Sequence, residues 1–438
     1  MSRKSNRRLL VVQVAGLGWG LVQGREASTI LGRDWVPMET VFPAVTCTVQ
    51  ASFRTGVPVG RHGIVANGWM DRDLRRTFFW EQSAALVGGP RIWSDFRESG
   101  NRVAMLFWQQ SLGEAVDAVL SPAPIHKHHG GLIDATYALP EGLYDTVAER
   151  VGEKFNLRNY WGPMASVRSS GWIAKATAAL LQDEALAPDL CLTYLPGLDY
   201  DLQRFGPGHP RSGNAIQSVE QQLKDLLEAA TTAGYDWLVF GDYAIVRAEK
   251  PVFINRSLRN AGWMATREIA GRSYPDMHTS RAVAVVDHEI AHIYLRNPGD
   301  AGEAGACLLD TEGVESVLNP GEQKDRGLMH PRGGDLIAVA EDGDWFAYDW
   351  WTDRREAPDY AGHVDIHNKP GFDPRELFWG WPPGSVSLDA SRVGGTHGRT
   401  GKGREVAMAA SYDVGSPQTL LDLSNAVGES LSASFSDR

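Results

Sequence analysis

Short runs of apolar residues, separated by stretches with helical spacing, organise the first half of the chain. The apolar runs are residues 9–15, Val103–Trp108, Leu190–Leu195 and Trp237–Phe240, and the helical stretches are Ser170–Glu184 and Ala215–Ala233. Unbroken apolar runs of this length are typical of parallel strands buried on both faces. Alternating strands and helices predict an α/β fold, with a doubly wound, mostly parallel sheet flanked by helices. Ligands of such sheets lie beyond the carboxyl ends of the strands.

The pattern changes after Arg247. Residues 250–384 contain short strand-like pieces among many Gly, Pro and Asp residues, and core-like sequence returns near Ser385. We therefore predict a core formed by residues 1–249 and 385–438, with an inserted α+β cap at residues 250–384.

The composition limits the binding partners and the cellular compartment that we expect for this protein. The net charge of −11 argues against a protein that binds nucleic acid or an anionic membrane through its overall field. The three cysteines, Cys47, Cys191 and Cys307, are far apart and form no CxxC pair, which favours a reducing, cytoplasmic setting. No run reaches the roughly 18–20 apolar residues that a membrane helix needs.

The segment most suggestive of chemistry is residues 42–69, FPAVTCTVQASFRTGVPVGRHGIVANGW. A Pro-led turn precedes Thr46, and a helix of small and apolar residues is expected to follow it. Thr46 would then lie at a helix N-terminus, where free N–H groups and the helix dipole favour an anion such as a phosphoryl group. A Thr hydroxyl is a weak nucleophile unless a metal or a base activates it. The alternative is that Thr46 is only a helix cap.

This segment resembles the nucleophile segment of the type I phosphodiesterase/nucleotide pyrophosphatase branch of the alkaline phosphatase superfamily, which is related to phosphonoacetate hydrolase. In that pattern the nucleophilic Thr lies nine residues before a Thr-Gly pair, and His-Gly-Ile and an Asn follow. The matching residues here are Thr46, Thr55, Gly56, His62, Gly63, Ile64 and Asn67. The resemblance implies that Thr46 is the nucleophile and that Asn67 contacts the substrate.

The resemblance also implies two metal ions held by Thr46 and six further ligands. Three of the six are present: Asp199, Asp242 and His397, the last in a full Gly-Thr-His-Gly match. The other three are replaced, because Ala15 stands for an Asp, and Gln203 and Tyr243 each stand for a His. Each ion would keep two ligands, whereas stable transition-metal sites usually have three or four.

Replacement ligands are available in residues 363–373, HVDIHNKPGFD. Asp365 and His367 are two residues apart, so in an extended segment they would point the same way. This segment and the Thr-His-Gly-Arg ending resemble a bacterial branch of the superfamily, which makes Asp365, His367 and His397 candidate ligands. Mixed Asp and His ligands suit one or two divalent ions, zinc or manganese. The alternative is that His367 is a surface loop residue.

Two further groups of histidines stand out. By analogy with phosphonoacetate hydrolase-like relatives, the cluster His126, Lys127, His128 and His129 would contact the substrate or a metal, although solvated His runs also exist. The HEIAH sequence at residues 288–292 matches a zinc-protease motif that works only on a helix. Its β-like flanks, AVAVVD and IYL, argue against a protease.

These observations predict a metal-dependent hydrolase of a small phosphate ester, phosphodiester or phosphonate, with Thr46 as nucleophile. One alternative is a metal-free, non-catalytic binding protein on the same fold. Another is a phosphoryl transferase or mutase that uses a single metal. No nucleic-acid or membrane partner is expected, and the sequence leaves the oligomeric state open.

Overall fold

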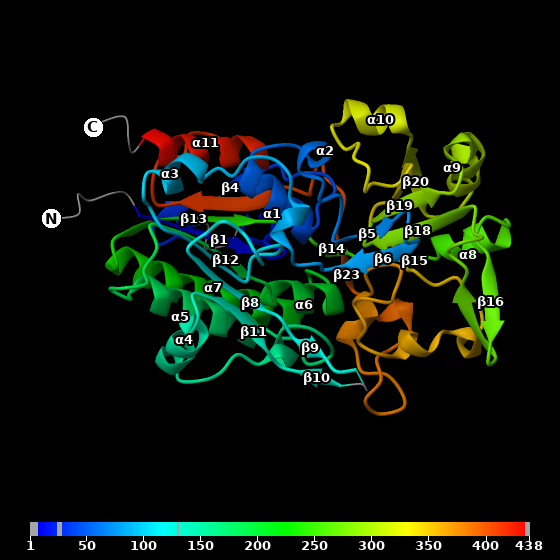
Figure 1. The fold of residues 1–438 in the computed structure, drawn as a ribbon, viewed down its shortest axis with the longest axis horizontal. Helices are drawn as coiled ribbons and strands as arrows, with labels where there is room; N and C mark the ends of the chain where they lie inside the picture. The colour runs from blue at the N-terminus through cyan, green and yellow to red at the C-terminus, as the bar shows by residue number, and fades with distance from the viewer. Residues whose placement is uncertain (1–7, 24–28, 129–130, 434–438) are drawn as a thin grey trace.

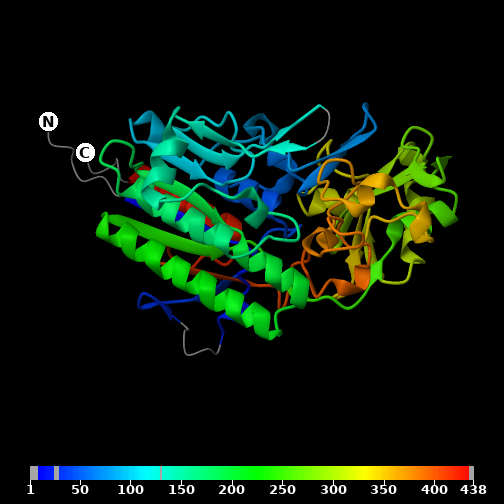
Figure 2. The same cartoon turned by 90° about the horizontal axis from the view of Figure 1, so that it is seen from below.

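The computed structural model describes residues 8–23, 29–128 and 131–433. An eight-stranded sheet dominates it, and a four-stranded sheet lies at one end of the molecule (Figures 1 and 2). The spatial order of the large sheet is β11 (Thr136–Leu139), β8 (Ala118–Pro122), β7 (Val103–Leu106), β12 (Leu190–Leu195), β1 (Arg8–Val14), β13 (Tyr235–Gly241), β24 (Val406–Ala410) and β4 (Val36–Met38). The run from β8 to β13 is parallel, and the outer strands pair antiparallel. The predicted mostly parallel α/β sheet is thus confirmed.

Helices cover both faces of the large sheet. Along β1, Leu10 and Val12 pack with the helices of one face, and Leu9 and Val11 pack with those of the other. The first face carries α4 (Leu143–Val151), α5 (Arg168–Leu181), α6 (Gly197–Phe205) and α7 (Pro210–Thr232). The second carries α1 (Thr46–Thr55), α3 (Ser94–Glu98) and α11 (Leu420–Ala433). Burial on both faces is why residues 9–14 of β1 are apolar apart from Gln13.

Buried residues between Val252 and Ala361 form a second hydrophobic cluster around an antiparallel sheet, and we call this part of the structure the cap. Its strands, in spatial order, are β18 (Ala282–Asp287), β19 (Ile290–Leu295), β21 (Leu336–Ala340) and β20 (Val314–Leu318). The helices α8 (Ile254–Asn260), α9 (Ala301–Leu309) and α10 (Pro320–Asp325) and the hairpin β16 (Thr266–Ile269) to β17 (Arg272–Pro275) accompany it. The earlier hairpin β5 (Gly68–Asp71) to β6 (Arg76–Phe79) also packs against this sheet, through Met70 and Phe79.

Short two-stranded pairs and a four-residue helix lie outside these two sheets. They are β2 (Thr29–Ile30) with β3 (Arg33–Asp34), β9 (Ile125–His126) with β10 (Leu132–Ile133), β14 (Val246–Arg247) with β23 (Gly395–Thr396), β15 (Pro251–Val252) with β22 (Trp345–Phe346), and the helix α2 (Val59–His62). Within the described ranges, no helix is long and apolar enough to cross a membrane.

The helix predicted at Ala215–Ala233 begins five residues earlier in the structure. Pro210 occupies its first turn, where the missing N–H has no helical partner, and His209 caps it by accepting a hydrogen bond from the Arg211 N–H. The polar residues of this first turn carry no apolar periodicity, so the pattern alone placed the start too late.

Candidate active site

The carboxyl ends of β1, β12 and β13 meet at the end of the core that faces the cap (Figure 1). Two close backbone approaches shape this edge. Gly16 has a φ of +68°, which favours glycine, and a Cβ on Gly241 would lie 2.2 Å from the Leu17 carbonyl oxygen. The tight turn after β1 therefore brings its backbone beside the residues that follow β13.

Thr46 is the first residue of α1, as the sequence predicts. Its cap residue Val45 is extended and offers no side-chain hydrogen bond to the helix. Asn67, which lies later in the sequence, caps the helix instead. Its side-chain Oδ1 accepts a hydrogen bond of 3.0 Å from the Cys47 N–H. Thr46 is 4% exposed, and its Oγ1 lies 3.3 Å from the Tyr194 hydroxyl and 3.4 Å from the Tyr243 hydroxyl.

Asp199, in the first turn of α6, is bonded on both carboxylate oxygens. The Tyr243 hydroxyl donates to Oδ1 over 3.0 Å, and the Gln203 Nε2 donates to Oδ2 over 2.6 Å. Tyr243 and Gln203 are two of the three residues that replace expected metal ligands. Their side chains therefore bind the carboxylate that the resemblance assigns to a metal.

Asp242 is fully buried directly after β13. Its Oδ1 accepts hydrogen bonds from the backbone N–H of Gly16, at 2.9 Å, and of Tyr243, at 3.0 Å. Its Oδ2 accepts one of 3.1 Å from the Gln13 Nε2. Gln13 is the one polar residue in the apolar run of β1, and this isolated polar position was the sequence signal for a buried partner.

Burial controls the protonation of both carboxyls. It raises the pKa of Asp242 to about 8, and the hydrogen bond from the Gly16 N–H opposes this rise. It raises the pKa of Asp199 to about 6, against the hydrogen bonds from Gln203 and Tyr243. Burial, and then the charge of Asp199, holds the pKa of the Tyr243 phenol well above 10. At neutral pH, Tyr243 is therefore protonated and Asp199 is mostly ionised.

Two histidines complete the buried cluster. The His397 ring stacks on Tyr243 at 3.5 Å, and its Nδ1 lies 2.8 Å from the Ala44 carbonyl oxygen. The His288 ring lies 3.7 Å from His397, and its Nδ1 is 2.9 Å from the Asp287 carboxylate. In both rings Nε2 has no hydrogen-bond partner among the described residues.

Asp287 links the cap to the start of α1. Its carboxylate accepts hydrogen bonds from the backbone N–H and the side-chain Nδ2 of Asn67, at 2.9 and 3.1 Å. Both polar atoms of the Asn67 amide therefore bind protein groups, because Oδ1 accepts from the Cys47 N–H and Nδ2 donates to Asp287. This side chain, predicted as a substrate contact, joins the cap to the helix that carries Thr46.

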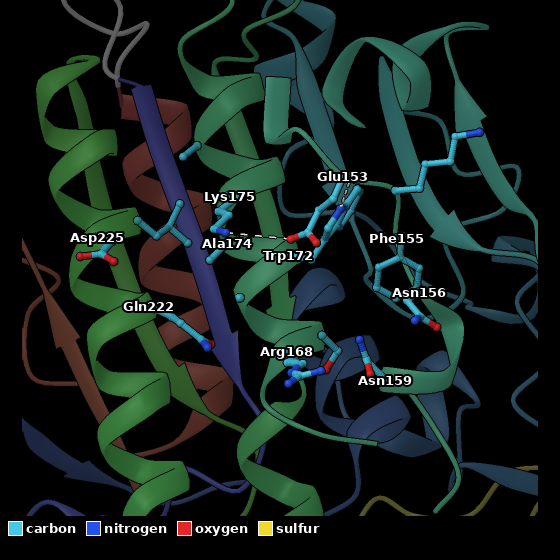
Figure 3. Close-up of a pocket in the computed structure, with 15 residues that line it drawn as sticks. Glu153, Phe155, Asn156, Asn159, Arg168, Trp172, Ala174, Lys175, Gln222 and Asp225 are labelled. Atoms are coloured by element: carbon cyan, nitrogen blue, oxygen red, sulfur yellow. Dashed lines mark hydrogen bonds and ion pairs between the residues drawn. The ribbon is translucent and has the colours of Figure 1, made fainter. Parts of the chain in front are cut away.

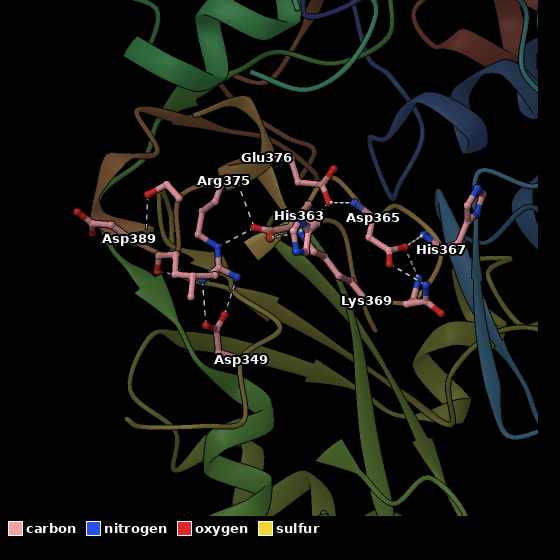
Figure 4. Close-up of polar contacts among 12 residues, drawn as sticks. Asp349, His363, Asp365, His367, Lys369, Arg375, Glu376 and Asp389 are labelled. Carbon is pink, nitrogen blue, oxygen red and sulfur yellow. Dashed lines mark hydrogen bonds and ion pairs between the residues drawn. The ribbon is translucent and has the colours of Figure 1, made fainter. Parts of the chain in front are cut away.

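Asp365 and His367 lie in a turn of their own. The Asp365 carboxylate accepts hydrogen bonds from the backbone N–H groups of His367 and Asn368 and from the Asn368 Nδ2. Figure 4 shows the His367 ring pointing away from this carboxylate. The extended geometry expected for the segment is wrong, because the Asp side chain stabilises a turn instead.

The same segment is anchored by buried charges. Lys369 donates hydrogen bonds to Asp373 and Glu376, and Arg375 pairs with Asp373 and Asp349 (Figure 4). These side chains are almost fully buried, so the conspicuous KPGFDPRE sequence fixes the loop within the cap.

Of the predicted histidine cluster, His126 ends β9, and Lys127 and His128 follow it. Lys127 and His128 are exposed, and His129 lies outside the described residues. His126 pairs with Leu132 in the short ladder. No hydrogen bond among the described residues joins this segment to Thr46 or to the two buried aspartates.

A cavity of about 650 Å³ lies along α5 and α7 (Figure 3). Charged groups of both signs line it, including Glu153, Arg168, Lys175 and Asp225. None of the residues around Thr46 lines this cavity, so it is separate from the cluster described above.

The donor set around Thr46 does not fit the two-metal site that the resemblance implies. A methyl group, a phenol and an amide replace three ligands, and both oxygens of Asp199 already bind the latter two. Within the described part of the chain, no group of three or more His, Cys, Asp or Glu side chains could hold a metal ion. Of the predicted ligands, Asp199, Asp242 and His397 all contact Tyr243, whereas Asp365 and His367 belong to the turn described above.

Sequence reasoning missed Tyr194, which lies in the apolar run of β12 and carries no signal of its own. Its reading of HEIAH is confirmed, because His288 lies in the turn between β18 and β19 and His292 lies within β19. His288 adopts a φ of +59°, a conformation that few residues other than Gly adopt and in which His is enriched with Asn and Asp.

Comparison with known proteins agrees with this fold. Phosphonoacetate hydrolase from Sinorhizobium meliloti 1021, in complex with phosphonoacetate, has a TM-score of 0.62 and 17% identity, over 98% of this chain and 96% of that chain. Murine ectonucleotide pyrophosphatase/phosphodiesterase 5 has a TM-score of 0.60 and 16% identity, over 97% and 95%. An inactive variant of the murine protein was solved in complex with AMP, with a TM-score of 0.59 and 15% identity, over 97% and 95%. No curated protein matches the sequence.

The sequence itself matches a family description over residues 11–373, which covers both the core strands and most of the cap. That range includes Thr46 and the two buried aspartates, and it ends before His397. The chain belongs to the type I phosphodiesterase/nucleotide pyrophosphatase family of phosphoesterase-type hydrolases, within the alkaline phosphatase superfamily.

Proposed function

We propose that the chain hydrolyses a phosphate ester, phosphodiester or phosphonate, with Thr46 as the nucleophile. The observation that carries this proposal is the position of the Thr46 hydroxyl. It lies at the N-terminus of a ten-residue helix and beyond the carboxyl ends of parallel strands, and two tyrosine hydroxyls contact it. The helix dipole favours a phosphoryl group there.

The proposed reaction uses this chain's own residues. Thr46 Oγ1 attacks phosphorus and displaces the leaving group, and water then cleaves the phospho-threonine. The α1 N-terminus stabilises the negative charge of the transferred group.

The metal dependence expected from the resemblance is not part of this mechanism, because the donors that replace the ligands bind Asp199 themselves. Zinc or manganese remains the ion that mixed Asp and His ligands would suit. Elemental analysis of the purified chain, described below, tests this point independently of turnover.

The direct test of the proposed function is Thr46→Ala, assayed with bis(p-nitrophenyl) phosphate, p-nitrophenyl phosphate and p-nitrophenyl phenylphosphonate. We expect the natural chain to release p-nitrophenolate and to carry a phosphorylated Thr46, detected by mass spectrometry of the quenched protein. Thr46→Ala removes both signals, whereas Thr46→Ser, which keeps the hydroxyl, retains them. Equal turnover by Thr46→Ala would reject the proposal.

A second candidate is a non-catalytic protein that binds phosphorylated ligands. Two observations favour it: Thr46 is only 4% exposed, and Tyr243 and Gln203 hydrogen-bond to both carboxylate oxygens of Asp199. Calorimetry with AMP and phosphonoacetate, ligands of the similar structures, distinguishes the two. Tight binding without release of any product would favour this candidate.

A further inference from the structure

A continuous chain of hydroxyl contacts leads from Thr46 to a buried carboxylate. Thr46 Oγ1 lies 3.4 Å from the Tyr243 hydroxyl, and that hydroxyl donates to Asp199 Oδ1 over 3.0 Å. On the other side, Thr46 Oγ1 lies 3.3 Å from the Tyr194 hydroxyl. The two contacts of Thr46 are long for O–H···O bonds, as catalytic contacts often are before substrate binds.

The number of hydroxyl hydrogens fixes the direction of this series of hydrogen bonds. Each hydroxyl carries one hydrogen, and Tyr243 directs its hydrogen to Asp199. At the contact with Tyr243, the hydrogen must therefore come from Thr46. Tyr194 can then donate to Thr46, so that three hydrogen bonds run in one sense and end on Asp199.

We propose that Tyr243 is a catalytic proton carrier, which takes the proton of Thr46 while passing its own proton to Asp199. This inference rests on the proposed function and adds the group that activates the nucleophile. The family pattern has a metal-binding His at the position of Tyr243. Here Tyr243 would instead help to remove the proton of Thr46 by passing its own proton to the Asp199 carboxylate.

The proton movements balance over the whole reaction. As the Thr46 Oγ1–phosphorus bond forms and the bond to the leaving oxygen breaks, one proton moves from Thr46 to Tyr243 and another from Tyr243 to Asp199. When water cleaves the phospho-threonine, the same path runs backwards and returns a proton to Thr46 Oγ1. Asp199 ends ionised, as it began, and the proton lost by the attacking water leaves with the products.

The surroundings of Tyr243 keep this path in place. Its ring is stacked on His397 with the planes 2° apart, and His397 is held in turn by the Ala44 carbonyl. The Gln203 amide fixes the second oxygen of Asp199. Tyr243 is 2% exposed, so little bulk water competes for its hydroxyl.

The test is Tyr243→Phe, which removes the carrier and keeps the ring. The matched control is Tyr235→Phe, at the opposite end of β13, whose hydroxyl donates to the Pro188 carbonyl. With bis(p-nitrophenyl) phosphate as the probe, we measure the first release of p-nitrophenolate, which reports phosphorylation of Thr46. Tyr243→Phe should slow it by about 10²–10⁴-fold with little change in KM, as expected for loss of acid–base catalysis. Tyr235→Phe should leave it unchanged.

Asp199 is a positioning residue in this scheme, because it acts through Tyr243. In mixtures of light and heavy water, the natural chain should show a curved dependence of the first release on deuterium content, because two protons move together. Both Asp199→Asn and Tyr243→Phe should lose this curvature, which a purely structural loss would not change.

The possible outcomes separate this inference from the proposed function. If Tyr243→Phe keeps a rate within threefold of the natural chain, the relay is overturned. The proposed hydrolase function would still hold in that case, provided that Thr46→Ala is inactive. A release that survives Thr46→Ala, or a natural chain that releases nothing from any of the three probes, would overturn both. Equal losses in Tyr243→Phe and Tyr235→Phe would show an effect of the fold, and they would also overturn the relay.

Discussion

The phenol ring of Tyr243 lies parallel to the imidazole ring of His397, with centroids 3.5 Å apart and planes 2° apart. His397 belongs to the one motif of the ligand pattern that is complete in this chain, and Tyr243 replaces a ligand. The stack places the phenol hydroxyl between Thr46 and Asp199. The substitution therefore changes the chemistry of the site as well as its ligand count.

We predict that restoring the replaced ligands creates metal affinity. The variant Ala15→Asp, Gln203→His, Tyr243→His regains the three missing donors and releases Asp199 from its present partners. It should bind about two equivalents of zinc, as expected for a paired site, while the natural chain retains less than one. Elemental mass spectrometry after dialysis against zinc measures both.

The single variant Ala15→Asp is the control, because it adds a carboxylate and leaves Tyr243 and Gln203 on Asp199. It should bind no more zinc than the natural chain. Two equivalents of zinc in the natural chain would contradict the view that these donors prevent a paired site.

A second prediction concerns Tyr194, which lies on the donor side of Thr46 and outside the proposed proton path. Tyr194→Phe removes a hydrogen bond to the nucleophile but leaves the contacts from Thr46 to Tyr243 and Asp199. Because a neutral hydrogen bond contributes about 0.5–1.5 kcal/mol, we expect a loss of about tenfold or less in p-nitrophenolate release. A loss as large as that of Tyr243→Phe would show that the path runs through Tyr194.

Much of the core could be predicted from the sequence because its signals are strong and local. The apolar strands, the helix starting at Thr46 and the position of Asp242 after β13 all follow from burial on two faces and from turn residues. The arrangement of the turn around Asp365 could not be predicted. The Asp365 carboxylate could bind a distant ligand or the backbone N–H groups of the next residues, His367 and Asn368. Which of these it does depends on the tertiary structure.

The contacts of the cap with the site were also beyond sequence reasoning. Asn67 and Asp287 are 220 residues apart, and their hydrogen bonds depend on how the β18–β19 turn reaches the start of α1. Tyr194 lies in a run of apolar residues, and the pattern gives no reason to single out its hydroxyl. Such pairings require the tertiary arrangement.

A third prediction tests the buried charges that fix the loop of residues 363–376. Lys369 is 1% exposed, and its Nζ donates to the Asp373 and Glu376 carboxylates and to the His363 carbonyl. Lys369→Met would leave two buried carboxylates without this partner, which costs about 3–5 kcal/mol in the free energy of unfolding. Urea unfolding followed by tryptophan fluorescence measures the change.

Lys224→Met is the matched control, because the Lys224 side chain is partly exposed on α7 and pairs with the partly exposed Glu220 one turn away. It should shift the urea midpoint little. If Lys369→Met were equally mild, the buried network would contribute less to the stability of the loop than its geometry indicates.

The last prediction concerns acid unfolding and rests on His62, which is buried after α1. Its Nδ1 accepts a hydrogen bond from the Ile64 N–H, and its Nε2 lies 2.9 Å from the Ser52 hydroxyl. This pattern requires the neutral ring. Burial, followed by the charges of Arg54, His330 and Arg332, lowers the pKa of His62 to about 3.

In the unfolded chain a His has a pKa of about 6.5. Between pH 6.5 and 3 the unfolded state therefore binds one more proton than the folded state at this residue, and stability falls as the pH falls. The contribution of His62 is about 1.4 kcal/mol per pH unit within that window, and it is absent above pH 6.5. The variant His62→Gln, which keeps a donor and an acceptor but does not titrate, should lose this part of the slope. Urea unfolding of both proteins at pH 7.5, 6 and 5 tests it. Parallel pH profiles for the two would mean that His62 is protonated in the folded state, against the acceptor role of its Nδ1.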